Sequence, residues 1–272
     1  MDDRGPAQVR AGHPGDGARG HDRPARADDG HDRPAAQGRA QAALVDPDHA
    51  PGLVAPGPRD CAWRRLPALF PPFTTVWCRL HRWRELAVLD RALAVLVACL
   101  RLARGRRRRP TAAIVDTQSV PTGPQRGSRG YDAAKKVKGR KRVLLVDVEG
   151  DPLGLRVVPA DLHEHHALRA LAPDLAAHPT LLLIWLDRGF AGDEPELFLN
   201  GYGIAVEIVG IKKRQGFQIE PRRWKAEQTF GCLLRYRRLR VDDEMSCESS
   251  RGMTTLAALF MTGMRLERLI NS

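Results

Sequence analysis

Two aspartates stand in segments that are otherwise apolar. Asp116 lies within AAIVDTQSV (112–120), and Asp187 follows the apolar run 181–186. Such runs predict strands buried in a sheet, where a carboxylate is unfavourable unless it is paired or binds a cation. Two acids on neighbouring strands would also repel each other unless a cation lay between them. Because carboxylate oxygens of this kind favour Mg²⁺ or Mn²⁺, the pair predicts a divalent-metal site.

A site that holds two such ions, about 3.5–4 Å apart, needs a further carboxylate. Glu227 is the best candidate, because it shortly precedes Phe230 on the side of a predicted helix that faces the sheet. Glu207, in the middle of a predicted strand, is a weaker rival, and Asp147 is expected at most to line the site. A histidine-rich group also stands at a predicted helix start: His163, Glu164, His165 and His166. Because no partner ligands occur at matching spacing, a surface cluster is favoured over a metal site.

The hydrophobic pattern predicts the elements that must position these acids. After Pro71 and Pro72, Thr74 or Thr75 is expected to cap a first helix, and a second helix is expected over 86–102. The remaining pattern predicts strands at 112–120, 142–148, 153–158, 181–187 and 204–210, and helices at 163–178, 193–199, 221–239 and 253–269. Three antiparallel strands followed by alternating helices and strands indicate an α/β fold with a ribonuclease-H-like mixed sheet and flanking helices.

The composition narrows the classes of function. The chain has 272 residues and a formal net charge of +12, and its five cysteines show no CxxC spacing, which argues against a disulfide framework. It shows no secretory signal, and its apolar runs are too short to span a bilayer. We therefore expect a cytoplasmic protein whose positive charge binds a polyanion, most often nucleic acid.

The first 60 residues differ from the rest of the chain. Only six residue types (Ala, Asp, Gly, Pro, Arg and His) fill 51 of these positions, and their formal charge of −2 leaves +14 on residues 61–272. Such a segment cannot bury enough apolar surface to fold, so we expect it to be disordered, or not native sequence because a GC-rich gene was read out of frame. Residues 61–110 are expected to form a helical accessory segment, which either contacts DNA or simply packs on a neighbour, and residues 111–272 the catalytic domain.

Four blocks, in order along the chain, carry a resemblance to a known family: AAIVDTQSV, RGYDAAKKVKGRKRVLLVD, LDRGFAG and RRWKAEQTFGCLLRYRRL. They resemble the catalytic blocks of DDE transposases from bacterial insertion sequences. The likeness is greatest to the insertion-sequence-five family in the transposase group four superfamily, whose N-terminal block is similar to CAWRRLPALFPPFTTVWCRLHRWRE. By position, the resemblance implies that Asp116, Asp187 and Glu227 are the catalytic residues and the metal ligands.

The resemblance also implies a reaction and its partners. Two Mg²⁺ or Mn²⁺ ions would activate water to cut double-stranded DNA at the terminal inverted repeats, and the freed 3′-hydroxyl would then attack target DNA. A homodimer on DNA and a location on the bacterial nucleoid are implied as well. Two alternatives stay open: a non-catalytic DNA-binding remnant of a decayed transposase, and another ribonuclease-H-like nuclease, against which the tryptophan-rich block at 61–85 speaks.

Basic tracts next to the acids are expected to bind DNA phosphates. Each of the tracts 135–142, 211–214 and 235–240 could by itself be a solvated face. Because they flank all three acids, together they predict a DNA channel. The residues expected to bind DNA are Lys135, Lys136, Lys138, Arg140, Lys141, Arg142, Lys212, Lys213, Arg214, Arg222, Arg223, Arg235, Arg237 and Arg238. Trp224 and Phe230 are expected to be core anchors rather than base-stacking residues.

Overall fold

The structure, a computed structural model, describes residues 63–66, 68, 70–124, 127–209 and 221–272. The expectation for residues 1–60 lies outside this range, and so do Lys212, Lys213 and Arg214. Among the described helices, none combines the length and the apolar character needed to traverse a bilayer.

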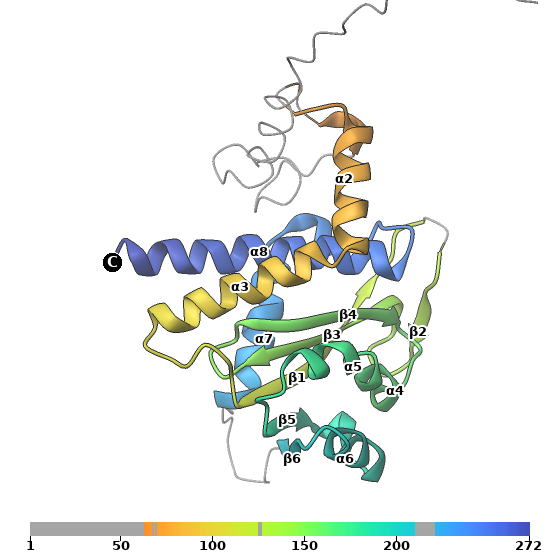
Figure 1. Cartoon of the computed structure of the whole chain (residues 1–272). Helices are drawn as coiled ribbons and strands as arrows, with labels where there is room; N and C mark the ends of the chain where they lie inside the picture. Colours follow the sequence, from red (N-terminus) through yellow and green to blue (C-terminus); the bar gives the residue numbers. More distant parts are fainter. Residues whose placement is uncertain (1–62, 67, 69, 125–126, 210–220) are drawn as a thin grey trace, which may run out of the picture.

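A mixed sheet forms the centre of the described molecule (Figure 1). Its strands are β1 (Ala112–Pro121), β2 (Gly130–Asp132), β3 (Val137–Asp147), β4 (Pro152–Pro159), β5 (Leu183–Asp187) and β6 (Ala205–Val209). Strand β3 is antiparallel to β1 on one side and to β4 and β2 on the other, whereas β1, β5 and β6 run parallel. The order β4-β3-β1-β5-β6 confirms the ribonuclease-H-like sheet that the sequence predicted.

Alternation along the strands sends side chains into two separate cores. Ile114 and Trp185 face a core shared with α2 (Phe73–Glu85), α3 (Val88–Ala103), α7 (Pro221–Leu233) and α8 (Cys247–Ile270). Their neighbours Val115 and Leu186 face a second core with α4 (Glu164–Arg169), α5 (Ala172–Ala177) and α6 (Asp193–Asn200). Figure 1 shows α3 and α8 lying side by side along the sheet. Helices therefore flank both faces, as expected.

Several element boundaries differ from the sequence prediction. The N-cap of α2 is Pro72, so neither Thr74 nor Thr75 caps this helix. The helix predicted over 163–178 is two short helices, α4 and α5, because the chain turns between them and Pro173 starts the second. Strand β2 and the early part of β3 were not predicted. Helix α7 ends at Leu233 instead of 239, and α8 begins earlier than predicted, at Cys247.

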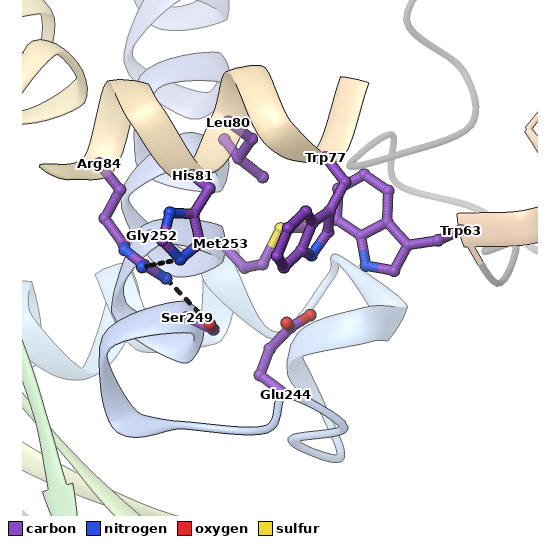
Figure 2. Close-up of a pocket in the computed structure, with 9 residues that line it drawn as sticks. All are labelled: Trp63, Trp77, Leu80, His81, Arg84, Glu244, Ser249, Gly252 and Met253. Atoms are coloured by element: carbon purple, nitrogen blue, oxygen red, sulfur yellow. Dashed lines mark hydrogen bonds between the residues drawn. The ribbon is translucent and has the colours of Figure 1, made fainter. Parts of the chain in front are cut away.

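The helical segment before the sheet is packed against the last helix. Arg84 of α2 donates to the hydroxyl of Ser249 at 2.9 Å and lies 2.7 Å from the ring nitrogen of His81 (Figure 2). Trp63 lies beneath the guanidinium of Arg238, whose central carbon is 5.1 Å from the ring centroid. These contacts fix α2 in place, and a DNA-contacting role for the segment stays a prediction.

Candidate active site

The two aspartates lie next to each other on parallel strands: Asp187 ends β5, and Asp116 is in the middle of β1. Val115 of β1 is the register partner of Leu186 of β5. Asp116 and Asp187 are the next residues on these two strands, so they lie side by side. Neighbouring strands are about 4.8 Å apart, and alternation turns both side chains to the same face. That face is the one of Ile114, against which α7 packs.

Glu227 lies on the helix that covers this face. Ala226, Phe230 and Leu233 are buried and fix α7 against the sheet, and the adjacent Glu227 is exposed at the edge of this apolar side. The charges of Asp187 and Glu227 both raise the pKa of Asp116. The structure therefore brings the three acids that the sequence singled out near one another on the face of the sheet that α7 covers.

Asp116 carries the electrostatic cost of this arrangement. Its pKa is raised from 3.8 to about 6, chiefly by desolvation on burial and to a smaller extent by the two neighbouring carboxylates. The amide of Thr117, which donates to Asp116 Oδ1 at 2.7 Å, and the charge of Lys135 act in the opposite direction. An amide also orients Asp187, since the Arg188 N–H donates to its Oδ1 at 2.8 Å. Both carboxylates are thus held by backbone groups, which orient them without neutralising them.

Comparison with known families fits this geometry. The family model described as Transposase DDE domain matches residues 107–246, a segment that contains all three acids. This chain belongs to that transposase family. Among solved structures, the catalytic core domain of BIV integrase is similar over 55% of this chain and 81% of that chain, with 14% identity and a TM-score of 0.35. No curated protein matches the sequence. Membership of the DDE family implies transposition, DNA as the partner and a typical use of divalent metals.

The acids of this DDE domain have the donor chemistry for such metals. Within the described residues, no group of three or more His, Cys, Asp or Glu side chains is arranged so that it could hold a metal ion. The three acids are nonetheless hard oxygen donors, and a divalent cation would offset both the desolvation of the Asp116 carboxylate and its repulsion by the other two. Asp116, Asp187 and Glu227 therefore fit the role of metal ligands by their chemistry.

The two rival acids are engaged elsewhere. Glu207 on β6 accepts a hydrogen bond from the indole N–H of Trp185 at 2.6 Å. Asp147 is fully buried at the end of β3, opposite Ala113 and three register positions from the Asp116–Leu144 pair, and it forms an ion pair with Arg101. The expectation that Asp147 lines the site is therefore wrong, because its charge is balanced inside the fold and away from Asp116.

The histidine cluster and the two aromatics of α7 also have defined places. His163 is the N-cap of α4, and His165 lies 3.6 Å from a carboxylate oxygen of Glu194. This arrangement accounts for the cluster without a metal. Phe230 is buried as expected, whereas Trp224 is 47% exposed. The prediction that Trp224 anchors the core is wrong.

Half of the first basic tract is buried inside the DDE domain. Arg140, Lys141 and Arg142 lie in β3 with at most 5% of each residue exposed. Arg140 forms an ion pair with Asp242 at 3.0 Å, while Lys141 and Arg142 donate to backbone carbonyl oxygens at 2.7 and 2.9 Å. The prediction that these three residues bind DNA is wrong, because their charged groups are used within the protein.

The other predicted DNA-binding residues have different environments. Arg238 is partly buried and pairs with Glu244 at 2.8 Å. Arg222 and Arg223 belong to the first turn of α7. The exposed members are Lys135, Lys136, Lys138, Arg235 and Arg237. DNA contact by the exposed members stays a prediction.

The sequence did not single out the polar residues that follow Asp116 on the other face of β1. The hydroxyl of Thr117, next to Asp116, donates to Glu164 Oε1 at 3.2 Å from the opposite face of the sheet. Asp132 accepts the hydroxyl of Ser119 at 2.6 Å and holds the turn that follows β2. An aspartate that caps a turn is a recognisable pattern, and it was the one signal that could have located this turn.

Proposed function

We propose that the chain is a metal-dependent DNA transposase of the insertion-sequence-five type, which cuts DNA at insertion-sequence ends and transfers the strand into target DNA. The observation that carries the proposal is the proximity of Asp116, Asp187 and Glu227 on the face of the sheet that α7 covers, within the segment matched to the DDE family. A homodimer on DNA and a bacterial cytoplasmic location belong to the same proposal.

The residues of the proposed site have different roles in the reaction. When bound, two Mg²⁺ or Mn²⁺ ions would supply Lewis acidity for two successive in-line displacements at phosphodiester bonds. Asp116, Asp187 and Glu227 would hold these ions between β1, β5 and α7. The amides of Thr117 and Arg188 keep the two aspartates oriented. The reaction needs no covalent bond between protein and DNA.

A cleavage assay with matched carboxylate variants tests the proposal. The full chain is incubated with Mg²⁺ and DNA that carries the inverted repeats flanking its gene. Asp187→Asn and Glu227→Gln should each lower the cleavage rate by more than about a hundredfold, because each removes a metal ligand worth several kcal/mol in the transition state. Glu207→Gln is the control, since Glu207 bonds to Trp185 on the neighbouring strand and should retain most activity.

Each outcome separates the candidate functions. A wild-type chain that binds the repeats in a salt-dependent way and never cuts them would favour a non-catalytic remnant of a transposase. Loss of cleavage in Glu207→Gln together with retained cleavage in Glu227→Gln would replace Glu227 by Glu207 as the third carboxylate. Cleavage that persists in Asp187→Asn would overturn the site assignment as a whole.

A further inference from the structure

The turn between β2 and β3 is fastened to β1 beside the acids. The carboxylate of Asp132, which is 7% exposed, accepts the amides of Ala134 and Lys135 at 3.1 and 3.0 Å and the hydroxyl of Ser119 at 2.6 Å. Lys136 completes the turn with a positive φ of 54°, a conformation that residues other than glycine adopt only when their surroundings hold them there. Asp132 thus joins the backbone of the turn to the strand that carries Asp116.

This turn delivers one ammonium group to the active site. Lys135 Nζ donates to the carbonyl oxygen of Thr117 at 3.1 Å, directly after Asp116 in the chain. The charge of Lys135 lowers the pKa of Asp116, which shows that the two groups interact. The basic residues Arg140, Lys141 and Arg142 of the same tract are buried and bonded elsewhere. Lys135 is therefore the member of this tract that the structure ties to the acids.

The chemistry of this contact favours exchange with a phosphate. A neutral carbonyl oxygen is a weaker partner for an ammonium group than an anionic phosphate oxygen, because charge-assisted hydrogen bonds are about twice as strong as neutral ones. Lys135 is also exposed, so a DNA strand can reach it. DNA phosphates that approach three carboxylates need positive charge at the same place to offset the repulsion.

We propose that Lys135 binds the DNA phosphate next to the reacting one, and that Asp132 and Ser119 act as positioning residues that aim it. The proposal rests on the proposed function, because it assumes that DNA lies over the three acids. Lys135 therefore contacts one specific phosphate, whereas Lys136, on the same turn, contributes only non-specific affinity for DNA.

A binding experiment with neutral phosphates tests the contact without any need for cleavage. Full-length protein is titrated with repeat DNA in which one phosphate near the element end is replaced by a methylphosphonate. In the wild type and in Lys136→Met, one such position should weaken binding about tenfold, as expected for one charge-assisted bond. In Lys135→Met the methylphosphonate at that position should no longer weaken binding, because the ammonium group that contacts the phosphate is already absent. Lys135→Arg should restore part of this weakening.

The positioning residues have their own readout. Ser119→Ala and Asp132→Ala leave Lys135 in place but release the turn, so both should reduce the sensitivity to the neutral phosphate. A merely structural role would lower thermal stability and leave that sensitivity unchanged. The proposal is overturned if Lys135→Met and Lys136→Met respond alike at every phosphate position.

A cleavage assay distinguishes a failure of the Lys135 proposal from a failure of the proposed function. If the wild type cuts DNA, Lys135→Met should lower the rate at saturating DNA about tenfold or more, while Lys136→Met should change mainly the DNA concentration needed for half-saturation. If the wild type does not cut, the catalytic proposal fails, and the phosphate-by-variant binding data still decide the role of Lys135.

Discussion

Replacing Asp116 by Asn should make the metal-free protein more stable while removing its activity. The folded state raises the pKa of this carboxyl from 3.8 to about 6, first through desolvation and then through the nearby acids. Each pKa unit corresponds to about 1.4 kcal/mol, so the ionised carboxylate destabilises the fold by about 3 kcal/mol at pH values well above 6. An Asn side chain carries no charge, and its Oδ1 can still accept the Thr117 amide that now bonds to Asp116.

The sign of the pH dependence follows from the same shift. Between pH 3.8 and about 6 the native state holds a proton on Asp116 that the unfolded state has released. This contribution to wild-type stability is therefore lost as the pH rises through that window, and it stays lost above it. The advantage of Asp116→Asn should be greatest near pH 8 and should vanish below about pH 4.

Guanidinium unfolding at pH 8 and at pH 4, with a chelator present, measures the effect. Glu196→Gln, on an exposed carboxylate of α6, is the matched control and should change the free energy of unfolding little at either pH. Millimolar Mg²⁺ should then stabilise the wild type more than Asp116→Asn, because an ion that binds only the native state adds to its stability. The electrostatic reasoning is refuted if Asp116→Asn is less stable than the wild type at pH 8, or if the difference does not depend on pH.

Three further variants test how the fold supports the site. Arg101→Met leaves the fully buried Asp147 without its ion-pair partner and should lower the free energy of unfolding by about 3–5 kcal/mol, measured by denaturant titration. Arg140→Met removes the buried partner of Asp242 and should also destabilise the fold, while gel-shift assays of the folded fraction show unchanged DNA affinity. Gly150→Ala places a Cβ 2.9 Å from a threonine hydroxyl of α7 at a backbone φ of 81°, so its melting temperature should fall by several degrees.

The sequence predicted the catalytic strands well because each strand is a local pattern. Asp116 and Asp187 stand out against runs of apolar residues, and the parallel pairing of β1 and β5 then brings them together. Glu227 was identified through its position relative to Phe230, whose burial orients the helix. These inferences needed only the periodicity of strands and helices, which a single sequence carries.

Charge was harder to interpret than apolar pattern. The tract 135–142 reads as one basic surface, but β3 begins at Val137, and residues 140–142 lie between β1 and β4 in the sheet. The burial of Arg140 is explained by its ion pair with Asp242. These two residues are about a hundred positions apart in the chain, so no local sequence pattern connects them. Whether a basic residue faces solvent therefore depended on long-range pairing, and only the structure supplied it.

The contrast between Asp147 and Asp116 shows why buried acids cannot be sorted from sequence alone. Both lie in apolar strands, and both must be compensated because an isolated buried carboxylate is unfavourable. Asp147 is compensated by Arg101 from α3, a partner that the fold supplies. Asp116 instead lies near two further acids, and desolvation by burial, the largest cause, keeps the pKa of Asp116 raised despite the charge of Lys135. Asp116 is thus a buried carboxylate without a full ion-pair partner inside the fold, which supports the proposed metal-binding role of Asp116 and a structural role for Asp147.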